Sequence, residues 1–177
     1  MCIPIRTKKI KLPKNVTVTY QGDSLILAGI HGTTAVKINS NLVITNDINH
    51  IFLTVPTKYK KYLGLYYSLL KTHLKGITQK FKINLFLKGI GLKVQKLEND
   101  LIFKLGYSHD IKIIIPNNID VTVFQNTNLI LYGFNWEQLT QFASNIKKLK
   151  KVEPYKGKGI LLKNEQILRK EGKKNKK

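Results

Sequence analysis

The apolar residues of this sequence change their spacing twice in the same order, and this repeated change limits the folds open to the chain. From about residue 16 to Pro56 they alternate with polar residues, which is typical of half-buried strands. From Lys58 to Gln79 they fall at helical spacing, which predicts one apolar helix face. That face would hold Leu63, Tyr66, Leu70, Leu74 and Ile77. Gly76 is expected to mark the end of this helix.

The same succession begins again at Phe81. Alternation over Phe81–Lys88, followed by further short apolar runs as far as Leu131, predicts a second set of strands. Asn135 would open a second helix, with Gln138 placed to complete a capping box. The buried stripe of that helix would hold Leu139, Phe142, Ala143, Ile146 and Leu149. We therefore predict an α+β fold of two tandem similar domains, each an antiparallel sheet with one main helix.

A sequence echo bears on how the two halves are related. Residues 12–19 (LPKNVTVT) resemble residues 115–122 (IPNNIDVT), and residues 25–29 (LILAG) resemble residues 129–133 (LILYG). Duplication of one unit would explain this likeness. Coincidence of hairpin chemistry would explain it as well. The echoed hairpin comes first in one half and later in the other, which simple duplication would not produce.

The charge is the extreme feature of the composition. The chain carries 31 basic and 10 acidic residues, a net charge of +21. Such self-repulsion works against a compact state, so a polyanionic partner is expected. Only Arg6 and Arg169 are arginines. Since lysine is a point charge without the bidentate fork of arginine, binding should depend on phosphates and shape more than on base edges.

The spacing of the remaining residues supports no other chemistry. The four histidines (His31, His50, His73 and His109) have no cysteine or close histidine beside them, so no zinc site is predicted. Residues 156–159 (KGKG) lack the upstream glycine and the Lys-Ser/Thr ending of a phosphate-binding loop. The acidic residues are scattered, mostly in predicted turns, so no carboxylate pair is predicted for acid–base catalysis. We expect no enzyme activity, no cofactor and no small-molecule substrate.

A membrane partner is also disfavoured. No apolar run approaches the roughly 18 residues of a membrane span, and the first residues lack the apolar core of a secretory signal. The predicted helix at 58–79 has an ordinary core stripe, unlike a basic helix that lies on a lipid surface. Cys2 is the single cysteine, which excludes an intrachain disulfide.

Three segments combine glycine with lysine or an aromatic residue, as RNA-binding loops do. Lys88–Lys93 (KGIGLK) contains two glycines, which indicate either a bulge that serves the sheet or a backbone that approaches a partner. Gly106–His109 (GYSH) is a turn for which a structural role and RNA contact are both open. Residues 152–177 carry paired glycines between lysines and a closing lysine cluster. This last segment is interpreted as a docked RNA contact in preference to a solvated end, because its isoleucines and leucines suit packing.

The motifs resemble those of the large-subunit ribosomal protein L-six family in its bacterial and organellar form. Residues 88–91 (KGIG), 105–109 (LGYSH), 115–116 (IP) and above all 153–160 (EPYKGKGI) match the signatures of that family in order. The resemblance covers nearly the whole chain and is strongest from Phe81 onward. It implies two tandem α/β domains of similar fold. It also implies a structural constituent of the large ribosomal subunit that binds ribosomal RNA near the sarcin–ricin loop, where translation factors dock.

The domain boundaries predicted on this basis are 1–80 for an N-terminal α/β repeat, 81–152 for a C-terminal RNA-binding α/β repeat, and 153–177 for a basic RNA-binding tail. By the likeness, the expected RNA contacts are Lys88, Gly89, Gly91, Lys93, Tyr107, Ser108, His109, Tyr155, Lys156, Gly157, Lys158, Gly159, Lys163, Arg169, Lys170, Lys173 and Lys174. The sequence departs from the family at residues 161–162 (LL), where Arg-Tyr is usual, and at residues 29–32 (GIHG), where a lysine-bearing loop is usual.

The expected partners are large-subunit ribosomal RNA and neighbouring ribosomal proteins. The near-absence of arginine together with abundant isoleucine and asparagine suggests an AT-rich genome. We therefore expect a mitochondrial ribosome, with plastid and bacterial ribosomes as the alternatives. A free-standing basic nucleic-acid-binding module is the alternative function.

Overall fold

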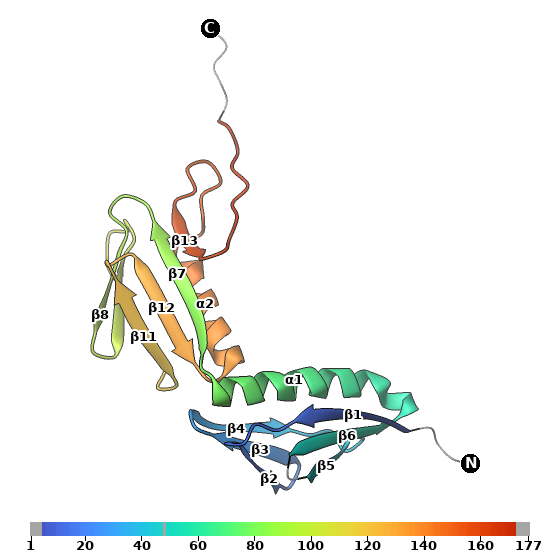
Figure 1. The fold of residues 1–177 in the computed structure, drawn as a ribbon. Coiled ribbons are helices and arrows are strands. Elements are labelled where there is room, and N and C mark those ends of the chain that lie inside the picture. Colours follow the sequence, from blue (N-terminus) through green and yellow to red (C-terminus); the bar gives the residue numbers. More distant parts are fainter. Residues whose placement is uncertain (1–4, 48, 173–177) are drawn as a thin grey trace. The chain divides into compact units, whose positions relative to one another are not determined.

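The computed structural model describes residues 5–47 and 49–172, and it divides the chain into two compact units (Figure 1). Unit 1 comprises Met1–Phe81 with Phe134–Trp136, and unit 2 comprises Lys82–Gly133 with Glu137–Lys177. Each unit holds one long helix and antiparallel sheets, so the α+β class is as predicted. In each unit, however, the strands are shared between two sheets, where the alternation predicts one.

The strands of unit 1 form two three-stranded sheets, with the orders β1-β6-β5 and β2-β3-β4. The strands are β1 (Ile5–Lys11), β2 (Thr17–Gln21), β3 (Ser24–Gly29), β4 (Gly32–Lys37), β5 (Val43–Asp47) and β6 (His50–Pro56). Alternate residues of β3 and β6 are fully buried, among them Leu25, Leu27 and Leu53. The period of two therefore predicts the core face of these strands correctly.

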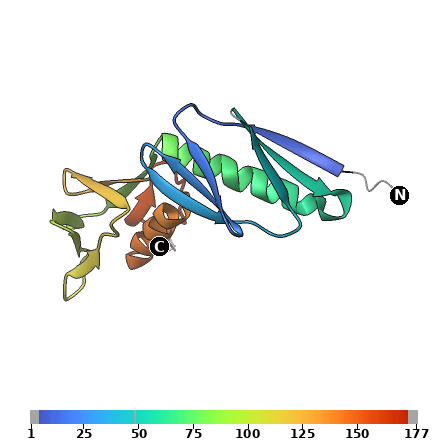
Figure 2. The same cartoon turned by 90° about the horizontal axis from the view of Figure 1, so that it is seen from below.

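Helix α1 (Lys60–Thr78) packs against both sheets of unit 1 and follows a short 3-10 turn at Thr57–Tyr59 (Figure 2). Its apolar stripe faces the core as predicted, with Leu63, Leu70, Leu74 and Ile77 buried and Tyr66 packed beside them. Gly76 lies inside α1, so the prediction that it ends the helix is wrong. A Cβ at Gly76 would lie well inside contact distance of the carbonyl oxygen of Phe134. This glycine therefore allows two backbone segments of unit 1 to approach closely.

Unit 2 has a four-stranded sheet of order β11-β12-β7-β13 and a three-stranded sheet of order β10-β9-β8. The strands are β7 (Phe81–Lys88), β8 (Lys93–Leu97), β9 (Asp100–Lys104), β10 (Ile111–Ile114), β11 (Ile119–Phe124), β12 (Asn128–Gly133) and β13 (Gly159–Leu162). Helix α2 (Trp136–Leu149) buries Leu139, Phe142, Ala143 and Ile146. Neither helix of the described residues is long and apolar enough to cross a membrane.

The echoed sequences fall on the hairpins β2–β3 and β11–β12. In unit 1 that hairpin belongs to the β2-β3-β4 sheet, whereas in unit 2 it belongs to the sheet that contains β7. The strand orders of the two units correspond to each other, β1-β6-β5 to β7-β12-β11 and β2-β3-β4 to β8-β9-β10. The two echoed hairpins hold different places in these orders. The echo therefore joins hairpins that are not equivalent in the two units, and it does not by itself indicate duplication of one unit.

Candidate nucleic-acid interface

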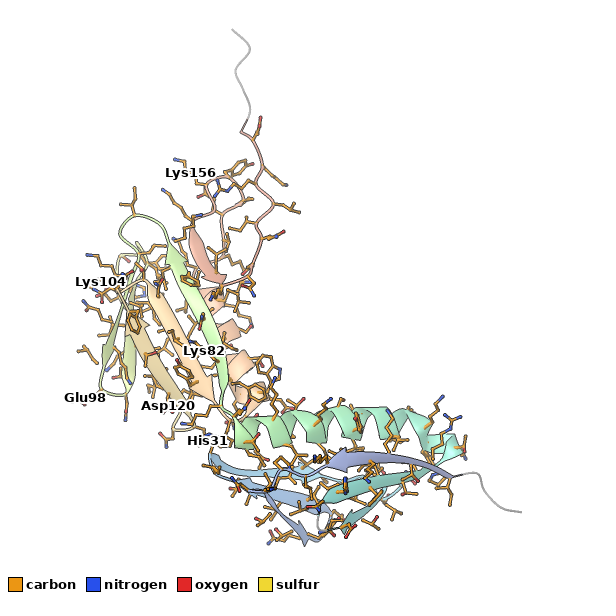
Figure 3. The ribbon with its side chains drawn as sticks, viewed as in Figure 1. His31, Lys82, Glu98, Lys104, Asp120 and Lys156 are labelled. Carbon is orange, nitrogen blue, oxygen red and sulfur yellow. The ribbon has the colours of Figure 1, made fainter. Side chains whose placement is uncertain are left out.

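Strand β13 brings the two lysine–glycine segments of unit 2 together. It pairs antiparallel with β7, with Gly159 opposite Lys88 and Leu161 opposite Phe86. The loop before β13 then lies beside the loop after β7, and a Cβ at Gly89 would be 3.6 Å from the Cβ of Lys158. Figure 3 shows Lys156 on the loop that enters β13, at the end of unit 2 where β7 runs into residues 88–93. Two segments about seventy positions apart in sequence thus form one surface. Most connections between neighbouring elements of compact domains are much shorter.

The loop before β13 is a closed turn that presents its polar side chains. The Glu153 amide donates to the carbonyl of Lys158 over 2.8 Å, and the Gly157 amide donates to the carbonyl of Glu153 over 2.9 Å. Tyr155 is 54% exposed, and Lys156 and Lys158 are exposed beside it. The turn therefore presents two cations, which suit phosphates, and an aromatic ring, which suits an unpaired base.

The glycines of this loop serve the fold of the loop itself. Both are buried. A Cβ at Gly157 would touch the side chain of Ile167 at 3.3 Å, and a Cβ at Gly159 would lie 2.8 Å from the carbonyl oxygen of Lys151. Backbone and side chain already occupy the space around them, so Gly157 and Gly159 set the path of the chain and leave contact with a partner to their exposed neighbours.

The 88–93 loop connects strands of two different sheets, so it is not a bulge within one strand. Lys88 and Lys93 are exposed at its two ends. Gly91 has φ +80° and nothing within 4 Å of its added Cβ, so its backbone is open to a partner. A Cβ at Gly89, by contrast, would meet the side chain of Leu92 at 2.9 Å. Between the two glycines Ile90 is 95% exposed, a feature that the sequence analysis did not single out.

Tyr107 holds the end of α2 in place. Its hydroxyl donates to the carbonyl of Leu149 over 2.9 Å, and the Nζ of Lys150 lies 4.4 Å from its ring centroid. The ring and the hydroxyl are thus engaged within unit 2, while Ser108 and His109 are exposed on the same bend. Lys150 is a candidate site residue that the sequence analysis missed. It belongs to a group of four lysines at the end of the predicted helix (Lys147, Lys148, Lys150 and Lys151), but that group also suits the helix dipole and does not single out Lys150.

Backbone contacts link these parts into one surface. The Ile160 amide donates to the carbonyl of Lys150 over 3.2 Å, which sets the end of α2 beside β13. We call this surface the basic end of unit 2, comprising residues 88–93, 107–109, 150 and 155–158. No group of three or more potential metal ligands occurs among the described residues, and the surface contains no carboxylate.

The segment after β13 is anchored by an ion pair. The Nζ of Lys147 lies 2.6 Å from Oε1 of Glu165, and the Leu162 amide donates to the other carboxylate oxygen over 3.2 Å. The hydrogen bond from Lys147 holds the pKa of the Glu165 carboxyl below its usual range. Further along, the Lys170 amide donates to the carbonyl of Pro154 over 3.0 Å.

The remaining predicted contacts belong to this C-terminal segment. Lys163, Arg169 and Lys170 are exposed on it. Lys173 and Lys174 lie outside the described residues.

The glycine loop of unit 1 at residues 29–32 contacts the end of α1 through its backbone. The His31 amide donates to the carbonyl of Ile77 over 3.3 Å, and a Cβ at Gly29 would meet the same residue at 3.0 Å. Figure 3 shows His31 at this turn, beside the end of α1. Gly29 therefore allows the β3–β4 hairpin to contact the helix.

Comparison with known proteins gives the family of the chain. The family model for ribosomal protein L6 matches residues 88–162, which begin at the 88–93 loop and end with β13. The large ribosomal subunit protein uL6c of Phaeodactylum tricornutum is 41% identical over 167 residues, 93% of this chain and 94% of the relative. The chain belongs to the ribosomal protein L6 family.

Other L6 relatives show the same extent of likeness. The uL6c protein of Trieres chinensis is 38% identical over 171 residues, 95% of this chain and 96% of the relative. The uL6 protein of Listeria monocytogenes (strain CLIP80459) is 34% identical over 172 residues, 96% and 97% of the two chains. These relatives are plastid and bacterial, so the expectation of a mitochondrial ribosome finds no support and an organellar or bacterial large subunit stands in its place.

Proposed function

We propose that this structural constituent of the large ribosomal subunit binds ribosomal RNA near the sarcin–ricin loop through the basic end of unit 2. Membership of the L6 family supports the subunit assignment. The pairing of β13 with β7 is the observation that carries the site, because it joins Lys88 and Gly89 to Lys158 on one surface. A surface of lysines without carboxylates suits a phosphate backbone.

Each part of the surface has a distinct role. Lys88, Lys93, Lys156 and Lys158 supply charge to phosphates, since all four are exposed. The open backbone at Gly91 lets a strand approach without a side chain in between. Tyr107 orients Lys150, and Tyr155 offers a ring for stacking or packing. The protein acts by positioning RNA, with no catalytic step, and neighbouring ribosomal proteins are its further expected partners.

The salt dependence of RNA binding tests this assignment. In the full chain, Lys156→Ala/Lys158→Ala should lower the slope of log affinity against log salt by about 1.4–1.8, since each lost phosphate contact removes about 0.7–0.9. The charge-matched control Lys37→Ala/Lys60→Ala, wholly in unit 1, should leave the slope unchanged. An RNA fragment that contains the sarcin–ricin region is the probe. Equal slopes for the two variants would place the RNA elsewhere.

Sedimentation separates this function from that of a free-standing basic module. The wild-type chain should travel with large subunits through a gradient at high salt, because many contacts of defined geometry outlast the loss of simple charge attraction. A chain that leaves the subunits as soon as salt is raised would support the free-standing module.

A further inference from the structure

Unit 1 carries a hollow that the proposed function does not use. It is an open hollow of about 610 Å³, within the range of about 300–1,000 Å³ typical of ligand sites. Its lining residues are Tyr67, Ser68, Lys71, Thr72 and Lys75 from α1, together with Phe81 and Trp136. All of them belong to unit 1. We call this hollow the α1 groove.

Aromatic side chains line one side of the α1 groove. The ring centroids of Phe81 and Trp136 are 5.0 Å apart, and their planes are inclined at 60°. This tilted arrangement fixes the orientation of the indole. Trp136 nevertheless stays 41% exposed, so part of a large apolar side chain faces solvent beside the hollow. An exposed apolar surface beside a concavity marks an interaction site.

The rim of the α1 groove is cationic. Lys71 and Lys75 line it from α1, and the Nζ of Lys75 lies 5.9 Å from the centroid of Phe81. The Nζ of Lys8 lies 4.7 Å from the centroid of Tyr67, which lines the same groove. No aspartate or glutamate occurs anywhere in α1. The lining residues of the groove thus combine aromatic rings with cations and include no acidic side chain.

We propose that the α1 groove takes an unpaired base of single-stranded RNA, stacked on the Trp136 indole, with adjacent phosphates on Lys71 and Lys75. Aromatic platforms flanked by positive charge bind single strands in this way, and they tolerate any base because every base has a π face. A duplex cannot supply the ligand, since its bases are stacked within the helix. This site lies on unit 1 and adds a second, base-stacking contact to the phosphate contacts proposed for unit 2.

The cationic rim also decides between RNA and a peptide. An apolar peptide would fill the hollow but supply no anion to Lys71 and Lys75, whereas the sugar–phosphate backbone beside a stacked base supplies an anion to each. Purines should bind more tightly than pyrimidines, because preferences on stacking platforms follow stacking strength.

The fluorescence of Trp136 reports on the groove directly, because it is the only tryptophan of the chain. Short oligoadenylate added to the full chain should quench it, and an abasic ribose-phosphate strand of equal length should not. Anisotropy of a labelled strand would report total binding in the same samples. Strand binding without quenching, or equal quenching by both strands, would overturn the proposal while leaving the basic end of unit 2 intact. Quenching by large subunits alone, with none by oligoadenylate, would instead indicate a protein occupant and also overturn it.

Two variants extend the test. Trp136→Ala should weaken oligoadenylate binding about 5- to 150-fold, the range for a lost base–aromatic stack. If that variant folds poorly, Lys71→Ala/Lys75→Ala keeps the indole and changes only exposed positions of a helix that tolerates alanine. It should reduce the salt slope of quenching by about 1.4. The matched control Lys60→Ala/Lys61→Ala, at the other end of α1, should not alter that slope, and equal effects of the two pairs would refute the site.

Discussion

Gly159→Ala should undock β13 and release the loop that carries Lys156 and Lys158. Gly159 has φ +140°, where a residue with a side chain is strained by about 1–3 kcal/mol. An added Cβ would also lie 2.8 Å from the carbonyl oxygen of Lys151 and 2.9 Å from the Cα of Val152. Both are backbone atoms, so they cannot move aside as the tip of a flexible side chain could.

The apolar surface buried by β13 limits the size of this effect. Ile160 is fully buried and Leu161 is nearly so. Since burial of one such side chain stabilises a protein by about 1.5–3 kcal/mol, complete undocking of the two costs at most about 3–6 kcal/mol. A loss of about 2 kcal/mol would already lower the Tm of a domain this size by about 8–16 °C. RNA affinity should fall as well, because Lys156 and Lys158 would no longer be held beside Lys88.

Thermal melts and amide hydrogen exchange together test this prediction. In Gly159→Ala the amides of Ile160 and Leu162 should lose protection, since the first donates to Lys150 and the second to Glu165. Gly91→Ala is the matched control, because it also has positive φ but meets no atom within 4 Å. It should show the strain alone and keep β13 docked. If both variants had the same Tm and kept their amide protection, the claim that a Cβ at Gly159 undocks β13 would be refuted.

Three further outcomes follow from the contacts described above. Within α1, Gly64→Ala should stabilise unit 1 by about 1 kcal/mol, whereas Gly76→Ala should destabilise it, because only the Cβ added at Gly76 meets backbone. Denaturant unfolding measures both changes, and a shift of the two midpoints in the same direction would contradict this. The folded pKa of Glu165 is depressed, so its contribution to stability is present above the unfolded pKa and is lost as pH falls through the folded pKa. NMR titration should show that pKa rising towards normal in Lys147→Ala, and no rise would exclude the ion pair as its cause. Tyr107→Phe should lower the free energy of unfolding by about 0.5–1.5 kcal/mol, because it removes one hydrogen bond. RNA affinity should change little, since the ring that orients Lys150 remains. A large loss of affinity would mean that the hydroxyl itself contacts RNA.

The local elements were predictable because they depend on neighbours in sequence. The stripe from Leu63 to Ile77 predicts which face of α1 is buried, since a helix repeats its surface every 3.6 residues. The role of Gly76 was not predictable in this way. Its reason is the carbonyl of Phe134, which comes from a distant part of the chain, and no local pattern records such an approach.

The candidate site was likewise predictable only in part. Its lysines and exposed rings could be selected from composition and motif, and the family model covers most of them. Their assembly could not, because it depends on a strand pairing in which Gly159 meets Lys88. Lys150 was missed for the same reason, as its place in the surface follows from contacts with Tyr107 and Ile160 that no sequence spacing reveals.

The pairing of β13 with β7 also sets an order of events while the protein is being made. Roughly seventy residues separate the paired segments, so at about 5–20 residues per second β7 waits several seconds for its neighbour. Throughout that interval the nascent chain presents an unpaired strand edge, the kind of edge that recruits other chains. The lysine loops of unit 2 come together only when β13 arrives to close this edge. A nascent chain thus completes the basic end of unit 2 at the same moment as it closes this strand edge.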